Sequence, residues 1–341
     1  ILAILVIFFQ TGNVLSDNNI FHVNNIEIEE RNNASSGELA NKAIKKGFNQ
    51  LIERILLKED IIKLSNLNLE EIKELILYYQ ILKKENLNNQ NSKSYYNLFF
   101  DREKMYDLFF KKNISYSDIV NKEIYLLPIL KKKNQIYIYN QNFFYDMWNE
   151  ISDNQLVEFI LPLENIEIIE NVNLNKNNLL NLELSKLLLE YSDRNLALVL
   201  IEDSDSKQEK IFLKLRILGK KINKNIIVKK DQSEKEFYEK IIKDVKDEIT
   251  NIIKSQNLID IRTPSFLNAK LIEKSNNNLV ELKKRVKNID LIEDIYVQEF
   301  NKNDFFLKIK YFGKINKIIN KFNKEKIILK LSGDEWSIKI L

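Results

Sequence analysis

The chain has 341 residues, a length that accommodates two or three domains of ordinary size. Hydrophobic residues make up 44% of it and glycine and proline are few, which is typical of a globular protein rather than a disordered one. Its 53 basic and 49 acidic residues are interspersed and leave a net charge of only +4. Because nucleic-acid binding requires a strong basic footprint, we expect no nucleic-acid partner.

The first stretch, ILAILVIFFQTGNVLSDNN, is an apolar run that ends at Phe9, well short of the roughly 20 residues of a membrane-spanning helix. Val14 and Ser16 have the spacing of small residues at a signal-peptide cleavage site before Asp17. The pattern predicts a signal peptide over residues 1–16 with a truncated start, and a periplasmic mature protein. The alternative is an uncleaved anchor, in which case the membrane is contacted through this segment alone. The chain has no cysteine, which excludes a lipidated cysteine and any disulfide.

A first α+β unit is predicted over residues 17–149. After a strand at 20–30, Ser35 and Glu38 have the spacing of a capping box, and apolar pairs then recur every four residues to Leu56, which predicts one long amphipathic helix. Gly47 lies on its apolar face, where it would allow close packing against a sheet. The rest of the unit reads as strands at 75–86 and 92–100, a helix at 102–110 and a strand at 124–130.

Two further units are predicted, at 150–261 and at 262–341. In the second unit a helix over LSKLLLEY precedes three strands, LALVLIED, KIFLKLRIL and INKNIIVKK, and a long helix begins at the capping box of Ser233 and Glu236. The third repeats the order strand, helix, strand, strand, helix, strand, with Gly313 before its second helix. This order predicts an α+β fold of consecutive small units, with helices packed on one face of mostly antiparallel sheets.

The residue inventory excludes many kinds of active site. His22 is the only histidine, so with cysteine absent the usual zinc sites and the Ser-His-Asp triad are out of reach. The six glycines form no phosphate-binding loop. We therefore predict no catalytic residue, no metal and no cofactor, and we do not expect an enzyme.

Carboxylates are the remaining candidates for chemistry. Glu202, Asp203 and Asp205 cluster in IEDSDSKQEK, and such acids serve glycoside hydrolysis or calcium binding in other proteins. The cluster lacks the glycine and distal glutamate of a calcium loop and lies between two strand patterns. A solvated hairpin turn is therefore the favoured interpretation, and a hydrolase is the alternative.

The segment 124–151, IYLLPILKKKNQIYIYNQNFFYDMWNEI, carries the candidate binding residues. Leu126 and Leu127 before Pro128 predict a strand buried on both faces that ends near a sheet edge, where proline's missing donor does least harm. In the segment that follows, alternation places Tyr137 and Tyr139 on one face of a strand. Asn142 is suited to cap the next helix, and Phe144 and Trp148, four residues apart, lie on one stripe of that helix. The favoured interpretation is a core in which Trp148 is buried, with any binding confined to the tyrosine face. The candidate binding residues are Tyr137, Tyr139, Asn142, Phe144 and Trp148.

The chain resembles the bacterial envelope proteins grouped as domain of unknown function 2066. The resemblance covers IEIEERNNASSGELANKAIKKGFNQLIERIL and YYQILKKENLNNQNSKSYYNLFFDREKMYDLF, and it continues with the apolar pair before Pro128 and with Asn142 and Trp148. Phe143 and Phe144 stand where that family has proline and tryptophan. The resemblance implies an exported α+β protein without an assigned activity. Together with the predicted signal peptide, it favours a non-catalytic interaction or scaffolding module with an envelope protein as partner; small-ligand binding is a further alternative.

Overall fold

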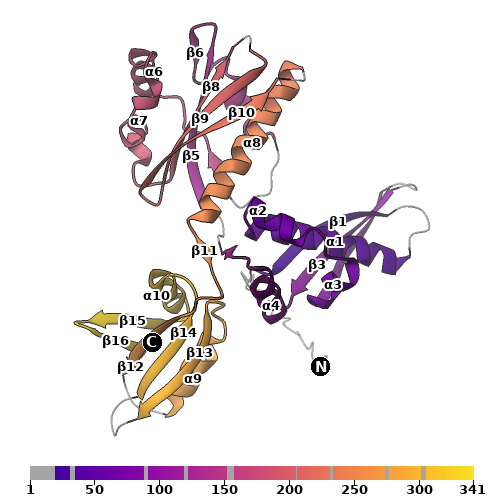
Figure 1. The fold of residues 1–341 in the computed structure, drawn as a ribbon, viewed down its shortest axis with the longest axis vertical. Coiled ribbons are helices and arrows are strands. Elements are labelled where there is room, and N and C mark those ends of the chain that lie inside the picture. Colours follow the sequence, from indigo (N-terminus) through magenta and orange to yellow (C-terminus); the bar gives the residue numbers. More distant parts are fainter. Residues whose placement is uncertain are drawn as a thin grey trace, which may run out of the picture. The chain divides into compact units, whose positions relative to one another are not determined.

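The computed structural model describes residues 20–30, 35–87, 91–118, 122–151, 157–204, 206–230, 233–272, 276–300 and 305–341. The cleavage site predicted at Val14, Ser16 and Asp17 lies outside these ranges. By its contacts the chain divides into two compact units. The first comprises Ile1–Ile52, Lys63–Ser115 and Ile259–Leu341, and the second comprises Glu53–Ile62 and Tyr116–Leu258. Helices and sheets occur in both units, so the predicted α+β class is confirmed (Figure 1).

The first unit contains two sheets, with strand orders β1-β3-β2 and β13-β14-β12-β16-β15. The pairs in the first sheet are antiparallel, and in the second β12 and β16 run parallel. The strands are β1 (His22–Glu30), β2 (Ile76–Leu87), β3 (Asn91–Phe100), β12 (Ser265–Leu271), β13 (Ile292–Phe300), β14 (Phe305–Tyr311), β15 (Ile327–Ser332) and β16 (Glu335–Ile340). The helices are α1 (Ser36–Ile55), which crosses into the second unit at its end, α3 (Leu69–Glu74), α4 (Arg102–Lys112), α9 (Asn276–Val286) and α10 (Ile315–Lys324).

Helix α1 packs on the β1-β3-β2 sheet as its sequence predicts. The backbone N–H of Glu38 donates to Ser35 Oγ at 3.2 Å, and the N–H of Ser35 donates to a Glu38 carboxylate oxygen at 3.0 Å, so the capping box is confirmed. A Cβ placed on Gly47 would lie 2.3 Å from Leu98 and 2.5 Å from Ile26, both on the sheet. The absence of a side chain at Gly47 therefore allows this helix to lie close to the strands.

The second unit is built on one mixed sheet of order β10-β9-β8-β5-β6, in which β7 also pairs with β5. Strands β7 and β8 run parallel to β5, whereas β6, β9 and β10 join by antiparallel pairing. The strands are β4 (Tyr116–Ser117), β5 (Lys122–Lys132), β6 (Gln135–Tyr137), β7 (Val157–Ile160), β8 (Leu196–Asp203), β9 (Gln208–Ile217), β10 (Lys220–Lys229) and β11 (Leu258–Ile259). The helices are α2 (Lys58–Ile61), α5 (Phe143–Met147), α6 (Ile166–Leu174), α7 (Leu184–Leu187) and α8 (Glu234–Ser255), and the short 3-10 turns are Leu179–Asn181 and Leu189–Tyr191. A further 3-10 turn, Ile62–Leu64, crosses from the second unit into the first.

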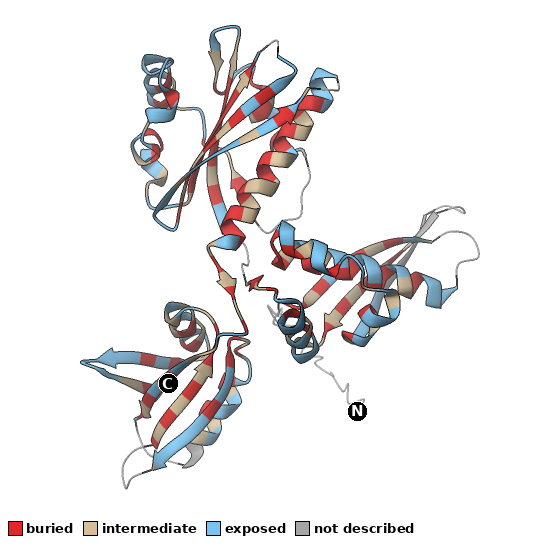
Figure 2. Ribbon diagram, in the orientation of Figure 1, coloured by how far each residue is buried: buried red, intermediate tan, exposed pale blue. Residues whose placement is uncertain are grey.

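Both faces of this mixed sheet are covered. Helices α5 and α8 pack on the face of Leu126, and α6 and α7 pack on the face of Leu127. Figure 1 shows α8 on one side of the sheet and α6 and α7 on the other. Neither leucine is exposed, so the prediction of a strand buried on both faces is confirmed. The expected arrangement with helices on one face is wrong for this unit, because two parallel crossovers place helices on opposite sides. In Figure 2 the buried residues run through β5 and β8 accordingly.

The unit boundaries differ from the predicted ones. Residues 116–149, assigned to the first unit from sequence, supply strands of the second unit's sheet, so the predicted boundary at 149/150 falls inside that unit. Residues 262–341, predicted as a separate third unit, are grouped by their contacts with the first unit, which resumes at Ile259. Residues Glu53–Ile62, which the sequence placed in the first unit, also belong to the second unit by their contacts.

Candidate functional site

Asn142 joins β5, β6 and α5 and is completely buried. Its side-chain oxygen accepts from the N–H of Phe144 at 3.1 Å, so the predicted cap of α5 is confirmed. Its amide nitrogen donates to the carbonyl oxygens of Pro128, Tyr137 and Ile138 at 3.0, 3.1 and 2.7 Å. These bonds engage both donors and the acceptor of the side chain, which makes Asn142 a structural crosslink.

Pro128 lies inside the sheet, and the prediction that its strand ends near a sheet edge is wrong. It pairs in register with Val199 of β8, while on the opposite side β5 pairs with β7 over 122–125 and with β6 over 130–132. Among the described strands, residues 126–129 therefore have no partner on that side. Because the nitrogen and carbonyl of one residue project to the same side of a strand, the ring of Pro128 faces this gap, and Asn142 bonds the carbonyl there.

The other candidate binding residues are mostly core. Phe144 and Trp148 are fully buried, and the Trp148 ring meets Phe159 of β7 at 6.1 Å between centroids, in agreement with the core interpretation. Tyr139 is 2% exposed, and its ring lies edge-on to another tyrosine. Tyr137 is half-buried and its hydroxyl donates to a glutamine of its own strand at 2.6 Å. Of the five predicted binding residues, only Tyr137 is accessible to a ligand.

The acidic cluster has two different environments. Glu202 is 41% exposed and pairs with Lys131 at 3.0 Å, as a solvated turn residue would. Asp203 has a side chain that is only 3% exposed, and it lies 2.8 Å from the Lys230 ammonium and 3.2 Å from that of Lys132. The solvated-turn interpretation is therefore wrong for Asp203. Asp205 lies outside the described residues.

Ion pairing keeps Asp203 charged. Burial raises the pKa of its carboxyl, but hydrogen bonds from Lys230, from the Tyr238 hydroxyl and from Lys132 outweigh burial and lower the pKa below its usual value. A general acid requires a raised pKa so that it holds a proton near neutral pH. Asp203 is thus unsuited to be the acid of a carboxylate hydrolase.

A hollow of about 620 Å³ lies over this network, beside the carboxyl ends of the parallel strands β5 and β8. Open sheets of this kind often bind ligands at that end. Three of its lysines already pair with carboxylates, those of Glu202, Asp203 and Glu234, and an anionic ligand would have to displace them. We attribute the network to stabilisation of this end of the sheet.

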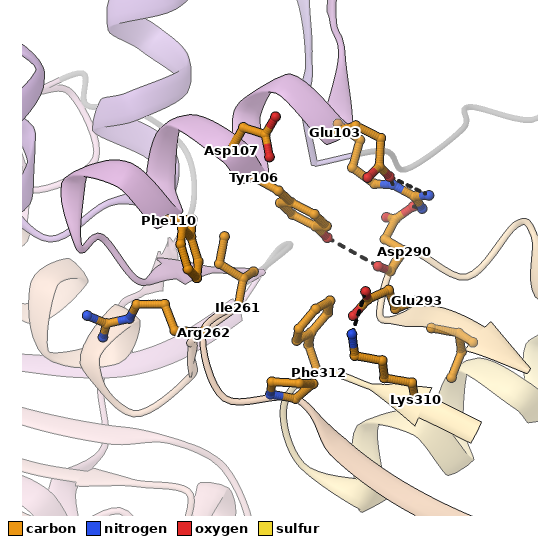
Figure 3. A pocket seen from close by; sticks show the side chains of 13 residues that line it. Glu103, Tyr106, Asp107, Phe110, Ile261, Arg262, Asp290, Glu293, Lys310 and Phe312 are labelled. Carbon is orange, nitrogen blue, oxygen red and sulfur yellow. Dashed lines mark hydrogen bonds and ion pairs between the residues drawn. The ribbon is translucent and has the colours of Figure 1, made fainter. Parts of the chain in front are cut away.

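A second hollow, of about 440 Å³, lies within the first unit (Figure 3). The Tyr106 hydroxyl donates to the carbonyl oxygen of Asp290 at 3.2 Å, and its ring lies edge-on to Phe312 at 6.0 Å. Lys310 pairs with Glu293 at 2.7 Å across the wall. Its lining is mixed in charge, and these polar groups are engaged with one another.

Strand β2 exposes an unusual amount of apolar side chain. It lies at the edge of its sheet and pairs with β3 alone among the described strands. Its first seven residues, ILYYQIL, carry no charge. The exposed side chains, here called the β2 edge surface, are Leu77 (65% exposed), Tyr78 (47%), Tyr79 (44%), Ile81 (53%) and Leu82 (48%).

Other edge strands of the described sheets carry the protection that sheet edges normally have. Soluble proteins place charged residues on sheet edges, or keep the edge strand short, because unpaired strands otherwise add to other chains. Strand β10 contains four lysines, β15 carries Lys330, β13 and β1 carry acidic residues, and β6 and β7 have only three and four residues. The first half of β2 carries no charge and is not short; its pairing with β3 is irregular between Ile76 and Tyr78 and between Ile81 and Lys83.

An aromatic row on the open face of the same sheet continues the β2 edge surface. Tyr78 stacks on Phe99 with centroids 4.2 Å apart, and Phe99 meets His22 edge-on at 4.5 Å. Phe266, exposed on the second sheet of this unit, is different, because a lysine ammonium lies over its ring: Lys308 is 4.5 Å from the Phe266 centroid. Such cation–π contacts shield a ring from other partners.

The β2 edge surface was not predicted from the sequence. Its signal is a run of seven uncharged residues within a strand, which in isolation also fits a fully buried strand. Within the described ranges, no cluster of three or more histidine or acidic side chains is arranged to bind a metal ion. None of the helices described combines the length and apolar character required to cross a membrane.

Comparisons with known proteins add little. No protein-family model matches the chain, and no curated protein does. Among solved structures, the chain is similar to one described as "Crystal structure of uncharacterized protein", with 13% sequence identity and a TM-score of 0.18, over 41% of this chain and 94% of that one. A similarity this low does not inform fold or function.

Proposed function

We propose that this protein is a non-catalytic interaction module of the cell envelope, and that it binds an extended segment of a partner protein as an added strand along β2. The β2 edge surface is the observation that carries the proposal. The predicted signal peptide and the resemblance to an exported family support the envelope location. The ion pairing of Asp203 makes the hydrolase alternative less favourable.

An added strand suits β2 because it would bond the unpaired backbone groups of β2 and bury its exposed apolar side chains. An edge strand presents unpaired N–H and C=O groups on its outer side, and a strand of another chain bonds to them directly. Full burial of a leucine or isoleucine side chain contributes about 1.5–3 kcal/mol, so half-exposed residues such as Leu77 and Ile81 would each gain about 1 kcal/mol on binding. The partner segment is therefore expected to be extended and apolar.

Site-specific photo-crosslinking tests this proposal in intact cells. A photo-reactive amino acid at Leu77 or Leu82 should form a crosslink to one defined segment of one protein, and the two positions should map to segment residues in strand register. Tyr79→Lys combined with Ile81→Lys should abolish the crosslink without changing the melting temperature, since charges on an edge oppose strand addition. Ile227→Lys is the matched control, because Ile227 is 66% exposed on the edge strand β10.

Three outcomes would contradict the proposal. Crosslinks scattered over many proteins would indicate non-specific contact. A single partner that is retained by the double-lysine variant would place the interface elsewhere. Loss of the crosslink in Ile227→Lys as well would show that added charge, rather than the β2 edge, is responsible.

A further inference from the structure

Residues 53–62 dock on one face of α8. Asp247, Asn251 and Lys254 follow at spacings of four and three residues, so they share a stripe of that helix. The backbone N–H of Lys58 donates to the Asn251 side-chain oxygen at 3.1 Å, and the Lys58 ammonium lies 3.4 Å from the Asp247 carboxylate. These contacts lie within the second unit.

Lys254 is the buried centre of this contact. Its side chain donates to the carbonyl oxygen of Leu56 at 3.0 Å and to that of Glu53. Helix α1 ends at Ile55, so these two carbonyls lie at its carboxyl-terminal end, where donors from outside a helix commonly bond the carbonyl groups. Lys254 thus caps α1 from another helix, although it is only 6% exposed.

We propose that the Asp247–Asn251–Lys254 stripe and residues 53–58 form a reversible clasp, which closes more tightly when Lys254 gives up its proton. A neutral amine retains two N–H donors, enough for the two carbonyls, and it no longer carries a charge into a buried site. The clasp is therefore a pH-sensitive device at the point where the chain passes from the first unit into the second.

The direction of the pH dependence follows from the groups that face Lys254. Burial lowers its pKa to about 8, while Asp247 and Glu53 oppose this shift and Lys58 adds to it. In an open clasp the side chain reaches water and returns to its ordinary pKa of about 10.4. The closed state then binds fewer protons between these two values, so closure strengthens as the pH rises through this window and does not vary at lower pH. The two pKa values correspond to a roughly tenfold gain in closure between pH 7 and pH 9.

Cysteine labelling measures the opening directly. The chain has no cysteine, so Leu57→Cys introduces a single thiol at a position that is 9% exposed in the docked segment. The labelling rate at each pH is divided by the rate for the unfolded chain at the same pH, which removes the titration of the thiol. Protection from labelling should increase about tenfold from pH 7 to pH 9.

Two further variants decide whether Lys254 is responsible. Lys254→Met, which keeps the length and removes the charge, should show protection that does not vary with pH. Lys243→Met, at an exposed lysine of the same helix, should keep the full pH dependence. Protection that does not change with pH in the parent, or a slope that survives in Lys254→Met, would overturn the proposal. If Lys254→Met does not fold, an NMR titration of Lys254 in the otherwise unaltered chain replaces it: a midpoint near 8 supports the clasp, and one near 10.4 overturns it.

Discussion

The side-chain amide of Asn142 donates to the carbonyl oxygen of Pro128 at 3.0 Å, and this bond closes the gap beside the proline inside the mixed sheet. The same amide group also donates to the carbonyl oxygens of Tyr137 and Ile138. A buried acceptor that loses its donor costs about 1–3 kcal/mol, so the position admits few replacements.

Asn142→Asp should therefore destabilise the second unit by about 3 kcal/mol or more, because a carboxylate would face three carbonyl oxygens without a proton to donate. Urea unfolding monitored by circular dichroism measures this loss. Asn165→Asp is the matched control, because Asn165 caps α6 through its side-chain oxygen alone and aspartate supplies the same acceptor. The free energy of unfolding of this variant should be unchanged. Equal effects of the two changes would contradict the assigned role of Asn142.

Gly47→Leu should destabilise the first unit by about 1–3 kcal/mol through overpacking, since even a Cβ at this position would overlap Leu98 and Ile26. Gly37 lies in the same helix with open space around it, and Gly37→Ala should be neutral or slightly stabilising. Thermal melting of both variants provides the comparison. A stable Gly47→Leu variant would mean that α1 lies farther from the sheet.

Trp148→Ala should cost about 3–5 kcal/mol, because it empties the largest fully buried side chain of the molecule's described core. The Trp148 ring should emit at short wavelength and resist quenching by iodide, measured in a Trp336→Phe background because Trp336 is half-exposed. Emission typical of exposed tryptophan, with full stability of Trp148→Ala, would overturn the core assignment and make this aromatic stripe the binding-site candidate.

Asp203→Asn should lower the free energy of unfolding by about 3 kcal/mol near neutral pH, because it leaves two lysines beside a neutral side chain. The pKa of Asp203 is lowered in the folded protein, so its stabilisation is present above the unfolded pKa of about 3.9 and is lost as the pH falls through the lower folded value. The difference between parent and variant should therefore be constant above about pH 5 and shrink in stronger acid.

Glu202→Gln provides the control for this series. Its side chain is 41% exposed, and exposed ion pairs contribute at most about 1 kcal/mol, so a small effect at all pH values is expected. Urea titrations at pH 7 and pH 3 distinguish the two carboxylates. A difference for Asp203→Asn that is equal at pH 7 and pH 3 would show that packing, rather than charge, explains the loss.

Local features of this chain were predictable from its sequence. The capping boxes at Ser35 and Ser233 and the cap at Asn142 depend on residues within a few positions of one another. The place of Gly47 on the apolar face of α1 follows from the helical period of its neighbours. The alternation of β9 and the continuous apolar run of β8 likewise predicted their strands correctly. Hydrogen bonding and side-chain period act over a single turn or strand, so the sequence displays them directly.

Pairing between distant segments was decided by the tertiary structure alone. Nothing in the residues around Pro128 indicates that β8, some seventy positions later, lies parallel to β5, or that Asn142 fills the gap on the other side. The uncharged run of β2 is compatible with either a buried or an edge strand until its neighbours are known. Which strand remains at an edge, and which helix buries a lysine such as Lys254, follows from the sum of many long-range contacts, and such contacts leave no periodic mark in the sequence.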